Sequence, residues 1–134
     1  MFSLSQYQWP DTAFLLAEND KFTRNLLKTL FKFTGSDICE VLSFDDLIKE
    51  LDNNSSIKVV IINDYFDGHD ITNLVTECLL KSSRIHFVVC TSISNVDTHK
   101  LHEYMQVDVL GKPFSPRKLM HLLDARLRTY KVKL

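Results

Sequence analysis

Residues 57–62 (IKVVII) constrain the fold of this chain more than any other stretch. Four β-branched residues stand in succession at 59–62, and the polar pair Asn63-Asp64 follows them directly. A strand with one face in water alternates apolar and polar residues, whereas an unbroken apolar strand is typical of a parallel sheet that is covered on both faces. The chain is therefore expected to hold a buried sheet between two layers of other elements.

Shorter apolar runs of the same kind recur along the chain, at residues 13–17, 38–42, 85–90 and 107–110. Apolar residues at helical spacing follow each run, most weakly around Leu101, Tyr104 and Met105. Parallel strands need crossover connections, and right-handed crossovers place helices on both faces of a sheet. The five strand-then-helix units predict an α/β fold, a (βα)5 three-layer sandwich around a five-stranded parallel sheet.

The predicted helices carry clear starting signals. Ser43 and Ser115 each precede a helical pattern and are predicted to be N-caps. The first helix is rich in phenylalanine. Its residues Phe22, Phe31 and Phe33 are expected in the core or at an interface, with the core as the default, because large apolar side chains are most often buried.

Length and composition indicate one soluble domain. The chain has 134 residues, expected to form one domain at 13–131 after a short arm at 1–12 whose Trp9 can pack on it. With 16 basic and 17 acidic residues the net charge is −1, so no overall basic field attracts nucleic acid or a membrane surface. No apolar run approaches the roughly 20 residues of a membrane helix. Cys39, Cys78 and Cys90 lack metal or disulfide spacing, which favours reduced thiols and a cytoplasmic location.

Polar side chains follow the predicted strands directly, at the edge where ligands bind in open α/β sheets. They are Glu18, Asn19, Asn63, Asp64, Thr91 and Lys112. Carboxylate and amide oxygens could hold Mg²⁺, while an ammonium group and a hydroxyl could hold the oxygens of a phosphoryl group. Asn19 or Asp20 can cap the first helix while Glu18 faces inward.

Four segments at these strand ends, LLAENDKFTR, VVIINDYFDGHD, VVCTS and LGKPFSPRKL, resemble receiver domains of two-component signalling over residues 13–130. The resemblance implies a flavodoxin-like receiver fold and a role in signal transduction rather than an enzyme activity. It implies that Lys112 contacts a phosphoryl group, that Thr91 is the hydroxyl residue near the acceptor, and that Glu18 is the first metal-binding acid. In the family the Lys-Pro bond after the fifth strand is commonly cis.

The sequence departs from the family pattern at three positions. The second metal-binding acid falls on Asn19, and the aromatic switch residue falls on Val109. A gap-free alignment puts Asn63 at the phosphoacceptor position, whereas a shift of one residue puts Asp64 there and turns the side chain to the other face of the sheet. Asn19 and Asn63 together predict a degenerate receiver, a pseudo-receiver, with weak or lost Mg²⁺ binding and no required cofactor.

The expected function is signalling through protein–protein contacts, with a histidine kinase or a downstream protein as the partner and a homodimer as a further option. By analogy with the family, the contact surface is the last strand and its flanking helices. Its apolar candidates are Tyr104, Met105 and Val109, beside the basic residues Arg117 and Lys118.

Two alternatives remain open. One is a live phosphoacceptor receiver that uses Asp64 in a phosphorelay. The other is a flavodoxin-like binder of a small ligand. Two features argue against a phosphate-binding form of it: Glu18 and Asp20 would repel a phosphate group, and the sequence contains no glycine-rich phosphate-binding motif. In either receiver reading, Lys112 is expected to bond directly to an acid at the end of the first or third strand, because an unpaired buried charge is costly.

Overall fold

The computed structural model describes residues 6–81, 84–91, 100–101 and 103–132. Five parallel strands form one sheet, in the order β2-β1-β3-β6-β7. They are β1 (Ala13–Ala17), β2 (Asp37–Glu40), β3 (Ile57–Asn63), β6 (His86–Thr91) and β7 (Val107–Gly111). Because each expected apolar run became one of these strands, the five-stranded parallel sheet is confirmed.

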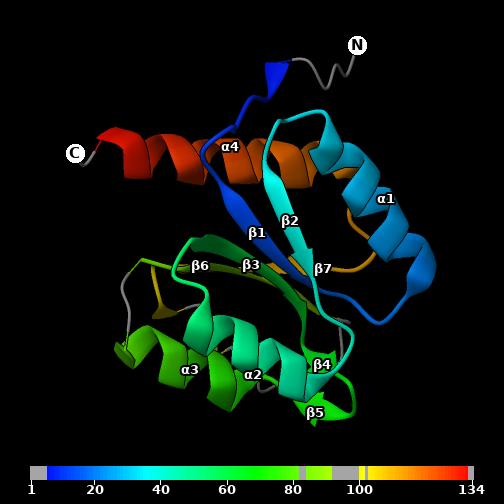
Figure 1. Ribbon diagram of the computed structural model, residues 1–134, viewed down its shortest axis with the longest axis vertical. Helices are drawn as coiled ribbons and strands as arrows, with labels where there is room; N and C mark the ends of the chain where they lie inside the picture. The colour runs from blue at the N-terminus through cyan, green and yellow to red at the C-terminus, as the bar shows by residue number, and fades with distance from the viewer. Residues whose placement is uncertain (1–5, 82–83, 92–99, 102, 133–134) are drawn as a thin grey trace.

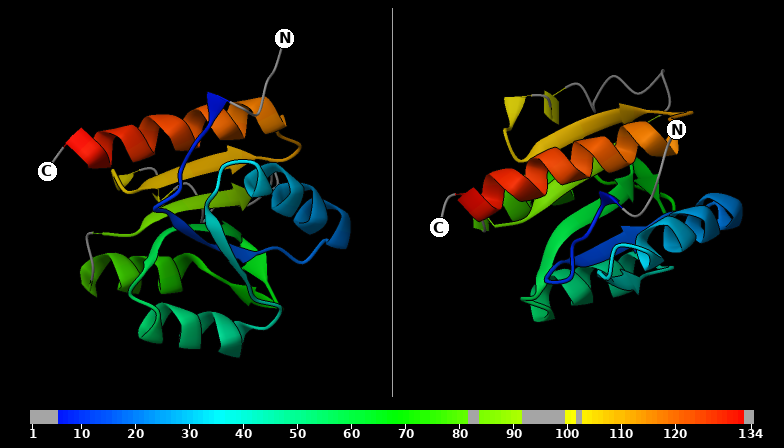
Figure 2. Two further views of the ribbon diagram at one scale, coloured as in Figure 1. Left: turned by 45° about the horizontal axis from the view of Figure 1, so that its top comes forward. Right: turned by 90° about the horizontal axis from the view of Figure 1, so that it is seen from above.

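Within the described residues four helices cover the sheet, two on each face, and the three-layer arrangement is therefore also confirmed (Figure 1). They are α1 (Lys21–Lys32), α2 (Phe44–Asn53), α3 (Thr72–Lys81) and α4 (Pro116–Val132). The views in Figure 2 agree that α1 and α4 lie on one face, and α2 and α3 on the other. Most of the weak helix expected between β6 and β7 lies outside the described residues.

Capping side chains begin three of the helices. Ser43 and Ser115 each accept a hydrogen bond from the backbone N–H three residues on, at 3.1 and 3.0 Å, as predicted. Asp20 does the same for α1, at 2.9 Å. Local sequence thus sets where these helices begin next to the site, and each cap stabilises the fold by about 1 kcal/mol.

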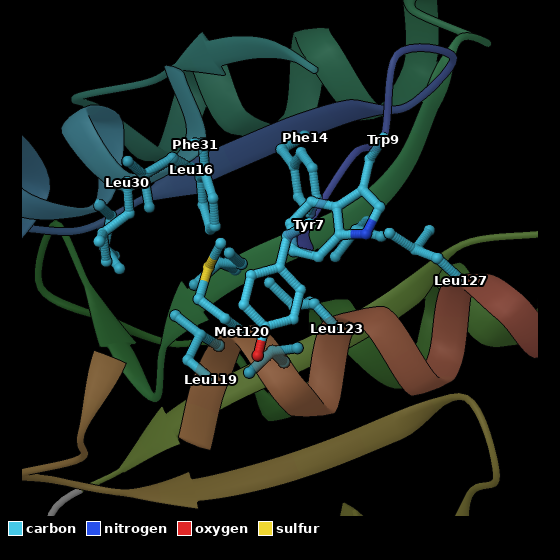
Figure 3. Close-up of a cluster of buried hydrophobic side chains, with 14 of the residues drawn as sticks. Tyr7, Trp9, Phe14, Leu16, Leu30, Phe31, Leu119, Met120, Leu123 and Leu127 are labelled. Carbon is cyan, nitrogen blue, oxygen red and sulfur yellow. The ribbon is translucent and has the colours of Figure 1, made fainter. Parts of the chain in front are cut away.

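Side chains alternate between the two faces of the sheet and build two cores. On the β1 strand Leu16 faces α1 and α4, while Leu15 belongs to the cluster that faces α2 and α3. Figure 3 shows the first of these clusters, in which Tyr7 and Trp9 from the N-terminal arm lie beside Phe14. The Trp9 indole also donates a hydrogen bond to Asp124 on α4, at 3.0 Å.

The outer face of α1 differs from the sequence-based expectation. Phe31 is buried and stacks on Phe14, with ring centroids 4.7 Å apart. Phe22 and Phe33, by contrast, are 76% and 57% exposed, so placing them in the core was wrong. The helix buries only the stripe that contains Leu27 and Leu30, and these two phenylalanines lie outside it.

A charged cluster lies at the opposite end of the sheet from the predicted site. Asp108 on β7 accepts two hydrogen bonds from the Arg126 guanidinium, at 2.7 and 2.8 Å, and its Oδ2 lies 2.6 Å from Nε2 of the buried His86. Burial alone would raise the pKa of the Asp108 carboxyl, but the bonds from Arg126 and His86 outweigh it and hold that pKa well below its usual range.

Asp108→Asn is expected to lower the free energy of unfolding at pH 6, because it removes the charge that Arg126 pairs with. The loss should be only about 1 kcal/mol, because Arg126 is partly exposed and solvent screens the pair. A carboxyl group whose pKa is lowered by folding stabilises the folded state at pH values above its pKa in the unfolded chain, which is about 4. This stabilisation is lost as the pH falls below that pKa. Urea unfolding of the wild type and of Asp108→Asn at pH 6 and pH 3.5 should therefore show a smaller difference in the free energy of unfolding at pH 3.5. A larger difference at pH 3.5 would contradict the stabilising role of the Asp108 carboxylate.

Candidate functional site

The carboxyl ends of four strands bring the predicted residues to one edge of the sheet. Strand order reverses between β1 and β3, which is where open α/β sheets bind ligands. Glu18, Asn63 and Asp64 are buried there, at 3, 6 and 8% exposure, and Thr91 and Lys112 are partly buried. The side chains form two separate polar groups.

The first group centres on the Glu18 carboxylate. Its Oε1 accepts a hydrogen bond from Nδ2 of Asn63 at 2.7 Å, and its Oε2 lies 3.1 Å from Nζ of Lys112. The backbone N–H of Asp20 donates to the same Oε1, at 3.0 Å. Lys112 thus makes the direct bond to a first-strand acid that the sequence predicted, and Glu18 neutralises its charge.

Asn63 has one unmatched atom within this group. Its Nδ2 is bonded to Glu18, but its buried Oδ1 has no hydrogen-bond partner among the described residues. A buried acceptor without a donor costs about 1–3 kcal/mol. The side chain is nevertheless held toward Glu18 and Lys112, because that contact satisfies the amide donor.

The second group pairs Asp64 with Thr91. The Thr91 hydroxyl donates to Oδ2 of Asp64 at 2.8 Å, and the Tyr65 backbone N–H donates to Oδ1 at 3.0 Å. Neighbouring residues of an extended chain turn to opposite sides, so Asn63 and Asp64 enter different groups. Asn63, rather than Asp64, is bonded to the acid that pairs with Lys112.

Asn19 lies beside this edge and bonds to the segment after β3. Its Nδ2 donates to the carbonyl of Tyr65 at 2.9 Å, and its Oδ1 accepts from the N–H of Asp67 at 3.2 Å. Both halves of the amide are therefore engaged with the backbone. Two acceptor oxygens in place of an amide could not make this pair of bonds, because a carboxylate cannot donate.

The segment that Asn19 holds is a short hairpin that sequence reasoning missed. Strands β4 (Tyr65–Phe66) and β5 (His69–Asp70) pair antiparallel, with Asp67 and Gly68 at positive φ between them. Asp67 accepts from the N–H of Phe44, at the start of α2, at 2.8 Å, and His69 stacks on Phe44. The only sequence signal was the Asp-Gly pair, which is a common hairpin turn.

The role of Arg24 was also missed from the sequence, because a single arginine on a surface helix belongs to no recognisable motif. Its Nη1 donates to the carbonyl of Glu18 at 2.9 Å, and its Nε pairs with Glu40 of β2 at 2.7 Å. The guanidinium ties α1 to both the β1 end and the neighbouring strand. It therefore fixes the backbone that carries Glu18.

The thiols do not add chemistry to this edge. Burial raises the pKa of Cys90, which lies below the site, to about 12, and burial also raises the pKa of Cys39 and Cys78. Nucleophilic thiols need a lowered pKa. Among the described residues, no cluster of three or more His, Cys, Asp and Glu side chains is placed to share a metal ion.

The predicted contact surface is only partly exposed. Met105 is 90% exposed, and Arg117 and Lys118 are exposed at the start of α4. Tyr104 and Val109 are half-buried and pack against the core beneath α2 and α3, so their placement among exposed apolar residues was wrong. Val109 pairs with Val89 of β6 in the sheet, and its side chain packs against that core. No helix of the described residues is long and apolar enough to cross a membrane.

No protein-family model and no curated protein sequence matches this chain. Solved structures do. A CheY-like response regulator receiver domain protein from Methanospirillum hungatei superposes with a TM-score of 0.80 and 13% identity, over 92% of this chain and 98% of that one. A response regulator receiver domain protein from Clostridium thermocellum gives 0.77 and 17%, over 92% and 99%.

The fold is that of a response regulator receiver domain. Its chain order places Lys112 after the last strand of the sheet, and the peptide bond from Lys112 to Pro113 is cis. An adenylate cyclase structure from Rhodopirellula baltica shares the fold, with a TM-score of 0.78 and 18% identity over 91% of each chain. The receiver fold therefore does not by itself assign an activity.

Proposed function

We propose that this chain is a receiver-type signalling module, not an enzyme, that acts through protein contacts and is not phosphorylated at the third strand. The carrying observation is the hydrogen bond from Asn63 to Glu18, beside Lys112. The resemblance to receivers implies that the lysine contacts the phosphorylated residue. In this chain the residue bonded to the partner of Lys112 is Asn63, whose side chain is an amide. An amide nitrogen is a poor phosphoryl acceptor at neutral pH, whereas an aspartate carboxylate is a competent nucleophile.

The charge pattern at the edge supports a pocket fixed in one state. In an acceptor-bearing receiver the lysine offsets the charge of the acceptor, and here Glu18 already offsets it. Val109 stands where the family has its aromatic switch residue, and it packs into the core. A signal would thus pass by binding and release of a partner rather than by phosphorylation.

Weak Mg²⁺ binding is part of the proposal, because the residues present do not fit a dedicated site. Glu18 is bonded to Lys112 and Asn63, and Asn19 offers one oxygen that already accepts from Asp67. Protein Mg²⁺ sites need one or two available carboxylates. Calorimetric titration should show no saturation at low-millimolar Mg²⁺. Saturable binding below 1 mM that disappears in Glu18→Gln would contradict this expectation.

One observation favours a second candidate, a live receiver that uses Asp64. Asp64 is a carboxylate beside a hydroxyl, since Thr91 donates to it at 2.8 Å. In the resemblance, the hydroxyl residue moves toward the acceptor. Against this candidate, Lys112 is paired with Glu18, and the Asp64 oxygens already accept two bonds.

A repair experiment tests the proposal. The double variant Asn19→Asp/Asn63→Asp restores both acids, and it should gain the mass of one phosphoryl group from acetyl phosphate and Mg²⁺. The matched control Asn19→Asp restores the metal acid but keeps Asn63 and Asp64, so it should gain nothing. Phosphorylation of this control, followed by its loss on Asp64→Asn, would favour the second candidate instead.

A further inference from the structure

The helices on the two faces of the sheet differ in charge. The sequence of α1, KFTRNLLKTLFK, contains four cations and no acid, whereas that of α2, FDDLIKELDN, contains four acids and one cation. The helix α4 lies on the same face of the sheet as α1 (Figure 2), and Arg117 and Lys118 are exposed in its first turn. The net charge of −1 is therefore unevenly distributed, and α1 with the start of α4 forms a basic face.

Four cations of the basic face are available to an outside ligand. They are Lys21 and Lys32 at the ends of α1, and Arg117 and Lys118, all of which are exposed and have no ion-pair partner within the described part of the chain. The other two cations of α1 are engaged, since Arg24 and Lys28 both pair with Glu40 of β2, at 2.7 and 2.8 Å.

Large apolar side chains lie among these cations. Phe22, Leu26 and Phe33 are 76, 39 and 57% exposed. Because Arg24 and Lys28 place one flank of α1 beside β2, the turn of about 100° per residue puts the three apolar side chains on the opposite flank. Exposed phenylalanine and leucine next to lysine are typical of helices that lie in a membrane interface.

This combination favours a lipid surface over other partners of negative charge. The cations alone would suit a nucleic acid, which proteins bind mainly through its phosphates. A phosphate backbone, however, offers no apolar surface to phenylalanine and leucine, whereas the boundary between lipid headgroups and acyl chains accepts both kinds of side chain. A second copy of this chain would bring like charges together if the two basic faces met, which is unfavourable.

We infer that the basic face, through Phe22, Leu26, Phe33 and the four unpaired cations, docks the protein on the surface of an anionic membrane. The three apolar side chains enter the boundary between headgroups and acyl chains, and the cations pair with anionic headgroups. Apolar insertion and a basic patch are the two signals that together give stable peripheral binding. The acidic α2 lies on the opposite face of the sheet, so it points away from the lipid and favours this one orientation.

Vesicle co-sedimentation tests the inference. We expect the wild type to bind mixed phosphatidylcholine–phosphatidylserine vesicles at least about tenfold more tightly than pure phosphatidylcholine vesicles, and to be released as the NaCl concentration rises. Phe22→Ser/Phe33→Ser and Lys21→Ala/Lys32→Ala should each weaken binding to the mixed vesicles by about tenfold or more, since each removes one of the two signals.

The opposite face of the sheet supplies matched controls. Leu80→Ser removes an apolar side chain of α3 that is 82% exposed, and Lys49→Ala removes an exposed cation of α2. Both variants should bind the mixed vesicles as tightly as the wild type. A spin-labelled lipid should broaden the NMR amide signals of α1 and of the start of α4, and it should leave those of α2 and α3 sharp.

Several outcomes would overturn the inference. These are an absence of vesicle binding, equal affinity for the two kinds of vesicle, equal losses in the control variants, or broadening confined to α2 and α3. Tighter binding to a single-stranded oligonucleotide than to the vesicles, lost in Lys21→Ala/Lys32→Ala, would assign the basic face to a nucleic acid instead. The inference goes beyond the proposed signalling role, and its failure would leave the phosphoryl experiments unchanged, since none of these residues lies at the strand-end pocket.

Discussion

Trp9→Ala is expected to lower the free energy of unfolding by about 3–5 kcal/mol, the range for removing a large buried aromatic side chain. Trp9 is 2% exposed and lies against both Phe14 and Phe31, with ring centroids 5.7 and 6.3 Å apart. Its indole N–H is also bonded to Asp124. The substitution would leave a cavity between the sheet and α4, and Asp124 would lose the indole donor while keeping its ion pair with Arg128.

Urea unfolding followed by circular dichroism measures this loss. The control is Phe22→Ala, which removes another aromatic ring but one that is 76% exposed, and its effect should stay within about 0.5 kcal/mol. A Trp9→Ala protein less than 1 kcal/mol below the wild type would show that the N-terminal arm does not contribute to the core in solution. Equal losses of unfolding free energy in Trp9→Ala and Phe22→Ala would lead to the same conclusion, that the arm does not contribute to the core.

Lys112→Ala is expected to destabilise the fold by about 1–3 kcal/mol, the range for losing a hydrogen bond between charged groups. The reason lies with its partner. Glu18 is 3% exposed, so removal of the ammonium group leaves a buried carboxylate with only the Asn63 amide and a backbone N–H as donors.

A double-mutant cycle separates this contact from general effects of shortening Lys112. In the Glu18→Gln background the buried group is neutral, and Lys112→Ala should then cost at least 0.5 kcal/mol less than in the wild type. Equal costs in both backgrounds would mean that the two residues are not coupled and that Glu18 does not hold Lys112.

The sheet could be predicted because each strand is an apolar run between polar residues. Residues 13–17 became β1 without a change of boundary, and residues 57–62 gained only Asn63. The caps at Ser43 and Ser115 were local signals that the fold retained. The polar edge then followed, because parallel strands bring their carboxyl ends together.

Features that depend on side-chain direction or on long-range contacts could not be predicted in the same way. The β4–β5 hairpin has strands too short to show a period, and it is held by Asn19, which is distant in sequence. Phe22 and Phe33 have the composition of a core but lie on the outer side of α1. Val109 and Tyr104 were expected to be exposed, but neighbouring elements half-bury them.

Which of two adjacent residues faces the lysine was the least accessible feature from sequence. Asn63 and Asp64 differ by one position, and alternation along a strand sends them to opposite sides. The start and register of β3 relative to β1 decide which one meets Glu18. That register is set by packing over the whole sheet rather than by the residues at its end.

Incubation of the wild-type protein with acetyl phosphate and Mg²⁺, followed by intact-mass spectrometry, tests the central claim most directly. Asn63 is bonded to Glu18, which pairs with Lys112, so an amide stands where the acceptor carboxylate would be and the mass is expected to stay unchanged. A gain of one phosphoryl group that is lost on Asp64→Asn would contradict it and assign the acceptor role to Asp64.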